Sequence, residues 1–133
     1  MTTRVQIEAA WRGSRTRIFL DSHTPDWADP FQHGAAVSGA TRVLSAADPN
    51  AAMATIAGSG ADSVILFAKC QYGNSYYPTS VGHQHSALGG RDLFGEQLAA
   101  ARNHGMRVIA YFSNMWDSHE AGRRPEWRLV APQ

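Results

Sequence analysis

The sequence predicts an α/β fold, a partial TIM-barrel-like (β/α) fragment with a short parallel sheet. Two apolar runs, 63–69 and 107–112, are rich in β-branched and aromatic residues, as is typical of strands covered on both faces. Between them, residues 93–104 have apolar positions at helical spacing. A strand, a helix and a second strand in this order imply parallel neighbours with a right-handed connection.

The earlier part of the chain has weaker signals. A first strand is expected near 16–22, where an apolar run follows an arginine-rich approach. Pro25 and Pro30 then exclude a continuing strand or helix, so a loop follows. Residues 41–44 are a candidate for a further short strand.

Both helices have clear start signals. Asp48 followed by Pro49 is typical of an N-cap and a first helical position. Asp92 is the matching N-cap for the helix over 93–104, and glycines end both helices. After the last apolar run, 127–130 is a candidate edge strand.

Length and composition predict a single domain over residues 1–133. A net charge of +1 gives no electrostatic reason to expect nucleic acid or an anionic membrane as a partner. No run approaches the roughly 20 apolar residues of a membrane span. Cys70 is the only cysteine, so no internal disulfide forms and a cytoplasmic location is expected.

A sheet of three or four strands leaves its edges and one apolar face open. We therefore expect self-association, with two copies forming a homodimer that closes a barrel-like assembly. The remaining expected partner is a small-molecule substrate.

Three pairs of polar residues with i, i+2 spacing follow predicted strands or a predicted loop. In extended backbone this spacing places both side chains on one face. Asp and neutral His are ligands for zinc and similar divalent ions, so the pairs predict a metal site. Each pair alone is more typical of a turn or a helix cap, and the metal prediction depends on all three pairs lying at the same end of the sheet. The candidate metal ligands are Asp21, His23, His83, His85, Asp117 and His119.

Other residues at the same strand ends are candidates for chemistry or binding. Cys70 is a nucleophile only if a base lies nearby, and is otherwise an inert thiol. Aromatic side chains in the loops either stack on a substrate ring or cover the end of the core. The candidate catalytic residues are Asp21, Asp117, Lys69 and Cys70, and the candidate substrate-binding residues are Trp27, Tyr72, Tyr76, Tyr77 and Trp116.

Four stretches of the chain resemble a known family. They are FLDSHTPDW (19–27), GADSVILFAKCQYGNSYYPTSVG (60–82), DLFGEQLAAARNHGMRVIAYFSNMWD (92–117) and RRPEW (123–127). Together they are similar to the amino-terminal part of glycoside-hydrolase barrels of the α-L-fucosidase and β-galactosidase-like kind. The resemblance implies a sugar-facing half-site at the carboxyl ends of the first three strands. It does not supply the catalytic carboxylates, which come from later strands in that family.

Three classes of function follow from these observations. The first is a metal-assisted hydrolase for small esters or phosphoesters, with zinc or a similar ion. The second is a glycoside-hydrolase half-barrel that acts on or binds sugars through Asp21 and Asp117. The third is a folded fragment without catalytic activity.

Overall fold

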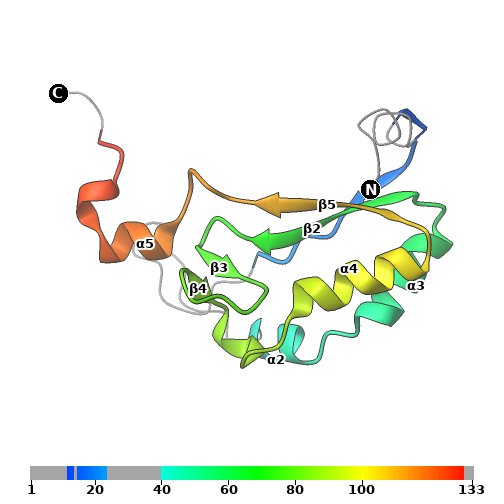
Figure 1. Ribbon diagram of the computed structural model, residues 1–133, viewed down its shortest axis with the longest axis horizontal. Helices are drawn as coiled ribbons and strands as arrows, with labels where there is room; N and C mark the ends of the chain where they lie inside the picture. The colour runs from blue at the N-terminus through cyan, green and yellow to red at the C-terminus, as the bar shows by residue number, and fades with distance from the viewer. Residues whose placement is uncertain (1–11, 14, 24–39, 131–133) are drawn as a thin grey trace.

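The computed structural model describes residues 12, 13, 15–23 and 40–130, and a parallel sheet lies at its centre (Figure 1). Strand β2 (Ser63–Lys69) is flanked by β1 (Arg17–Phe19) and by β5 (Arg107–Phe112), and both pairings are parallel. In space the order is β1, β2, β5, and helices lie between consecutive members of this set along the chain. The predicted α/β fold with a parallel sheet is therefore confirmed, and its completion as part of a β/α barrel stays a prediction.

Helices α3 (Pro49–Gly58) and α4 (Leu93–Asn103) cover one face of the sheet (Figure 1). Val64 and Leu66 of β2 alternate toward this face and are fully buried against the helices. The core there is aliphatic, and its buried members are Met53, Ile56, Ala61, Val64, Leu66, Ala100, Ala101 and Met106.

The predicted helix starts are confirmed. The Asp48 side chain accepts hydrogen bonds from the backbone N–H groups of Asn50 and Ala51, at 3.0 and 3.1 Å. The Asp92 side chain accepts one from the N–H of Gly95 at 2.8 Å. Both caps satisfy donors that a helix start would otherwise leave free.

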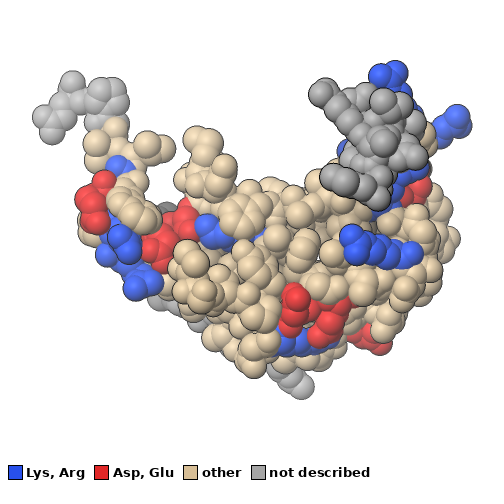
Figure 2. Space-filling model, in the orientation of Figure 1, with Lys and Arg blue, Asp and Glu red and all other residues tan. Residues whose placement is uncertain are grey.

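The opposite face of the sheet is covered by no helix among the described residues, and Figure 2 shows a hollow above it with mainly uncharged side chains. Phe67 points to this face and is buried by the rings of Phe19 and Tyr111, but Phe19 itself is 46% exposed. This face is the surface through which we expect two copies of the chain to associate.

If the two copies associate in this way, we expect light scattering to give twice the monomer mass. A compact monomer at high concentration would contradict the predicted self-association.

Three predicted elements differ from the structure. The first strand is shorter, spanning only Arg17–Phe19, and 41–44 lies within helix α2 (Ala40–Ser45) rather than in a strand. Leu44 is buried in a cluster at the carboxyl end of β2, so packing there favours the helix. The tail forms α5 (Ser118–Arg123) and a 3₁₀ turn, η2 (Pro125–Trp127), in place of an edge strand.

The long loop after β2 folds back onto the sheet. Its strand β3 (Asn74–Ser75) pairs antiparallel with the end of β2, and β4 (His83–Gln84) pairs with β3. The 3₁₀ turn η1 (Ser86–Leu88) then leads to α4. This loop is held by a second buried cluster, whose members are Leu44, Phe67, Cys70, Tyr76, Leu88 and Leu93. No helix in the described ranges is long and apolar enough to cross a membrane.

Candidate functional site

His23 lies in a cup of aromatic rings at the carboxyl ends of β1 and β2. Its imidazole stands edge-on to the rings of Phe67, Tyr111 and Tyr72, with centroids at 4.4, 6.0 and 6.2 Å. The His23 side chain is 23% exposed, and its Nε2 atom is buried and has no hydrogen-bond partner among the described residues. Buried polar nitrogens usually have a partner, so this atom needs a functional or structural explanation.

Asp21 holds the other side of the His23 ring. One carboxylate oxygen, Oδ1, lies 2.7 Å from Nδ1 of His23 and also accepts the backbone N–H of His23 at 2.8 Å. Partial desolvation acts to raise the pKa of Asp21, but these hydrogen bonds and the charge interaction with His23 outweigh it and lower the pKa. Asp21 therefore remains an anion at neutral pH. The predicted pair Asp21/His23 is thus a real contact.

Tyr76 fixes the backbone between these two residues. Its hydroxyl donates a hydrogen bond to the carbonyl oxygen of Ser22, and its ring is 1% exposed. Tyr76 is anchored in turn by its own N–H, which bonds the carbonyl of Ala68 at 2.9 Å. The end of β1 is therefore tied to the loop that follows β2. This gives Tyr76 a positioning role in the structure.

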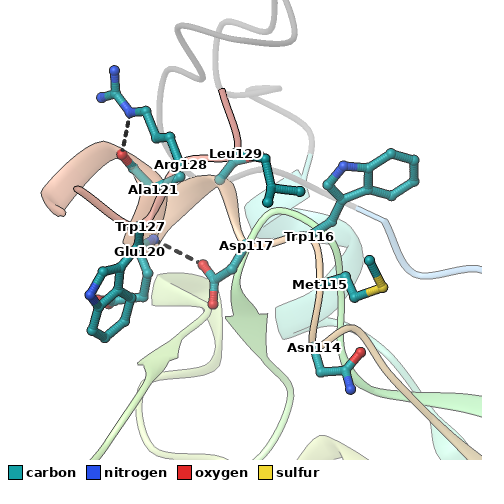
Figure 3. A pocket seen from close by; sticks show the side chains of 10 residues that line it. Asn114, Met115, Trp116, Asp117, Glu120, Ala121, Trp127, Arg128 and Leu129 are labelled. Carbon is teal, nitrogen blue, oxygen red and sulfur yellow. Dashed lines mark hydrogen bonds between the residues drawn. The ribbon is translucent and has the colours of Figure 1, made fainter. Parts of the chain in front are cut away.

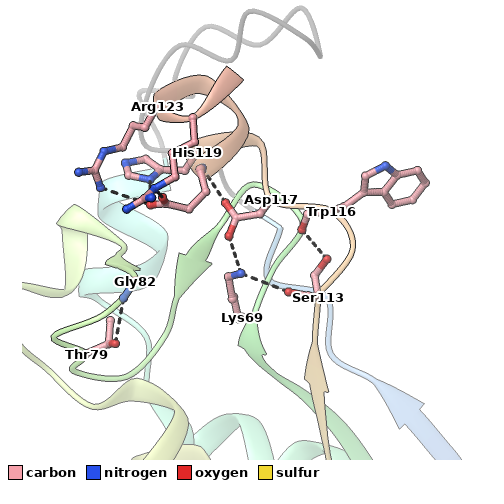
Figure 4. A network of polar contacts seen from close by, with 10 residues as sticks. Lys69, Thr79, Gly82, Ser113, Trp116, Asp117, His119 and Arg123 are labelled. Atoms are coloured by element: carbon pink, nitrogen blue, oxygen red, sulfur yellow. Dashed lines mark hydrogen bonds and ion pairs between the residues drawn. The ribbon is translucent and has the colours of Figure 1, made fainter. Parts of the chain in front are cut away.

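Lys69 and Asp117 form a joint between β2 and the segment after β5 (Figure 4). Lys69 Nζ lies 2.5 Å from Oδ2 of Asp117 and donates to the carbonyl of Ser113 at 3.3 Å. The other oxygen of Asp117 accepts the N–H of Glu120 at 2.9 Å and so caps α5. Both carboxylate oxygens of Asp117 are therefore engaged in holding the fold.

The remaining histidines do not join His23. His83 stacks on His119, with ring centroids 4.3 Å apart and planes 13° apart, and His119 Nδ1 lies 3.3 Å from Glu120. His85 is fully buried elsewhere, stacked on Tyr76 at 6.3 Å, and its Nδ1 accepts the N–H of Ala87.

The structure therefore divides the six predicted metal ligands among separate local contacts. Within the described ranges, no group of three or more His, Cys, Asp or Glu side chains is placed to hold an ion. The expected i, i+2 geometry fails at Asp117/His119 because Asp117 caps a helix that contains His119. Metal-assisted hydrolysis of esters or phosphoesters gains no support, and zinc binding stays a prediction that metal analysis of the purified protein tests.

Cys70 has the features of an inert thiol. It is fully buried, and burial raises the pKa of its thiol, although hydrogen bonds from Tyr76 and nearby backbone oppose this. A thiol with a raised pKa is a poor nucleophile because the thiolate is the reactive form.

We expect the Cys70 thiol to react with a disulfide reagent such as DTNB at least about a hundredfold more slowly in the native protein than in denaturant. Because Cys70 is the only cysteine, the absorbance change reports this site alone. Equal rates in the two states would show that the thiol is accessible.

Trp116 belongs to a different surface. It is 69% exposed and lines an open groove of about 510 Å³ beside α5 and η2, where Figure 3 shows its indole directed away from the Asp117 carboxylate. Trp127, also on this groove, is 61% exposed and lies under the Arg124 guanidinium. Tyr77 is half-buried in the loop after β3, and Trp27 lies outside the described residues.

The structure brings together only part of the predicted site. Asp21, His23 and Tyr72 meet at the aromatic cup, while Lys69 and Asp117 meet in the joint. The sequence analysis does not identify Phe67 and Tyr111, whose rings form walls of the cup. The alternation of side chains along a strand could have found them, because both point to the face that the helices do not cover.

Parallel strands β1, β2 and β5, helices on one face and polar side chains at the carboxyl ends of the strands define an α/β protein with a mainly parallel sheet. The model of a family described as hypothetical glycosyl hydrolase 6 (GHL6) matches residues 48–133. The chain belongs to this family, and the resemblance to glycoside-hydrolase barrels is confirmed.

Solved structures of fucosidases are similar to the chain. The α-L-fucosidase isoenzyme 2 from Paenibacillus thiaminolyticus has a TM-score of 0.61 and 26% identity, over 84% of this chain and 15% of the enzyme. A GH29 α-L-fucosidase from Bacteroides thetaiotaomicron has a TM-score of 0.52 and 18% identity, over 77% of this chain and 28% of that one. The α-fucosidase from Thermotoga maritima has a TM-score of 0.51 and 19% identity, over 77% of this chain and 32% of that enzyme.

At 18% and 19% identity, the similarity to the second and third of these structures shows the fold alone. This chain spans between 15% and 32% of the length of the three fucosidases. No curated protein sequence matches it significantly.

Proposed function

We propose that this chain is a sugar-binding segment of a glycoside-hydrolase barrel, with α-L-fucosides as the substrate class. Membership of a glycosyl-hydrolase family and similarity to a protein named as an α-L-fucosidase support the class of reaction. Hydrolysis itself is proposed for a whole barrel, because the fucosidases are several times longer than this chain.

The aromatic cup around His23 is the observation that carries the proposal. In β/α barrels, substrates bind at the carboxyl ends of the strands, and the cup lies at the ends of β1 and β2. L-Fucose carries an apolar methyl group and C–H surfaces suited to aromatic rings, together with hydroxyls suited to an imidazole. Tyr72 and Tyr111 are half-buried, so part of each ring remains accessible.

The two strand-end aspartates, Asp21 and Asp117, suit binding and support of the fold better than bond cleavage. Glycoside hydrolysis needs two carboxyl groups about 5 to 9.5 Å apart, one as acid and one as base or nucleophile. Asp117 is committed to Lys69 and to the start of α5. The proposal therefore assigns His23 to substrate binding, with Asp21 as its hydrogen-bonded neighbour, and it places hydrolysis on carboxylates other than Asp21 and Asp117.

Removing the imidazole tests the proposal. We expect His23→Ala to weaken binding of L-fucose to the 133-residue protein by at least about tenfold, the loss of roughly one good hydrogen bond. Saturation-transfer NMR titration measures the affinity of each variant. His104→Ala is the matched control, because His104 is exposed at the end of α4. Unchanged binding in His23→Ala, or no binding in the wild type, contradicts the proposal.

A further inference from the structure

We infer that Asp21 is a positioning residue that fixes the ring tautomer of His23, so that Nε2 presents a lone pair to a hydroxyl group of the ligand. This inference rests on the proposed function and goes further, because it assigns the direction of the recognition hydrogen bond.

The contact between the two side chains determines which nitrogen carries the proton. Asp21 Oδ1 lies 2.7 Å from Nδ1 of His23, and an ionised carboxylate only accepts hydrogen bonds. Nδ1 must therefore be the N–H of the neutral ring, and Nε2 is left as the acceptor. The lowered pKa of Asp21 keeps the carboxylate in this accepting form.

The surroundings hold the ring in that orientation. Oδ1 also accepts the backbone N–H of His23 at 2.8 Å, so the carboxylate is fixed relative to the residue it orients. Phe67 and Tyr111 stand edge-on to the imidazole. A flip of the ring would replace the Nδ1 contact by a C–H group facing a carboxylate, and the hydrogen bond would be lost.

The orientation selects the chemistry of the ligand. An Nε2 lone pair recognises a donor such as a sugar hydroxyl, and it gives no hydrogen bond to a group that only accepts. Nε2 is shielded from solvent in the free protein, so entry of the ligand involves a local adjustment of the cup. Binding is favoured because Nε2, which has no partner within the described part of the chain, acquires a hydrogen bond.

Two-bond ¹H–¹⁵N NMR spectra of the histidine rings measure the tautomer directly. The spectra are recorded at about pH 8, where histidine is ordinarily neutral. We expect the wild type to show His23 with Nδ1 protonated and Nε2 unprotonated. In Asp21→Ala we expect the Nε2-protonated form to become populated and L-fucose binding to weaken about tenfold. Asp92→Asn is the control, because it removes a carboxylate while the helix cap is retained.

The tautomer and the binding data separate two failures. If wild-type His23 is mainly protonated on Nε2, or if Asp21→Ala leaves the tautomer unchanged, the positioning role is wrong. If the tautomer shifts as expected but the wild type binds no L-fucose, the positioning role stands and the proposed function is overturned. A merely structural Asp21 would change stability without changing the tautomer of the folded protein.

Discussion

Replacing Gly73 with alanine is expected to destabilise this protein by about 4 kcal/mol, the largest loss that we predict for a single substitution. Gly73 has φ = +92°, and a Cβ atom there would lie 2.2 Å from Oδ1 of Asp117 and 2.8 Å from Cβ of His119. The positive φ alone costs about 1 to 2 kcal/mol for alanine. The clash separates the turn after β2 from the start of α5, and we expect a total near 4 kcal/mol, against a typical stability of about 5 to 15 kcal/mol.

The control for this substitution is Gly60→Ala. Gly60 has a similar φ of +84°, but a Cβ atom there meets nothing within 4 Å. Urea unfolding of both variants therefore separates the cost of the backbone conformation from the cost of the clash. Equal losses of unfolding free energy in the two variants would show that the turn does not press against Asp117.

Asp117→Asn is expected to destabilise the protein by about 2 kcal/mol. The Lys69 and Asp117 side chains are only 13% and 21% exposed, so removing the anion leaves a largely buried lysine without its partner. Breaking a fully buried ion pair costs about 3 to 5 kcal/mol, and partial exposure reduces that figure. Asparagine is still a good N-cap, so the substitution isolates the ion pair from the capping of α5.

Asp92→Asn serves as the reference for this prediction. Asp92 also caps a helix, through the N–H of Gly95, and it forms no ion pair with a lysine or arginine of the described ranges. We expect a change within about 0.5 kcal/mol by urea unfolding. If Asp117→Asn is equally mild, the contact with Lys69 contributes nothing and the joint is only a helix cap.

Much of the fold could be predicted because its signals are local. The buried strand 63–69, the strand 107–112 and the two N-caps, Asp48 and Asp92, each depend on residues adjacent in sequence. The helix over 41–44 could not be predicted in the same way. It depends on Leu44 packing against a cluster contributed by distant residues.

Individual residues of the site could be predicted from the sequence, but which of them lie together could not. Asp21/His23 could be read from spacing at a strand end, and the structure brings the two together. His83 and His119 are remote in sequence, and their stacking depends on how the loop after β2 meets α5. Asp117 follows a strand, which is typical of a catalytic carboxylate, yet in the structure it caps α5, a helix that the sequence does not predict.

Mapping where L-fucose binds tests most directly whether the cup at the ends of β1 and β2 is the sugar site. Aromatic ¹H–¹³C NMR spectra recorded during a titration report each ring separately. We predict shifts for His23, Tyr72 and Tyr111, which form the cup, and none for Trp116 and Trp127, which line the groove beside α5. Shifts confined to the two tryptophans, or no shifts at any ring, would contradict the assignment.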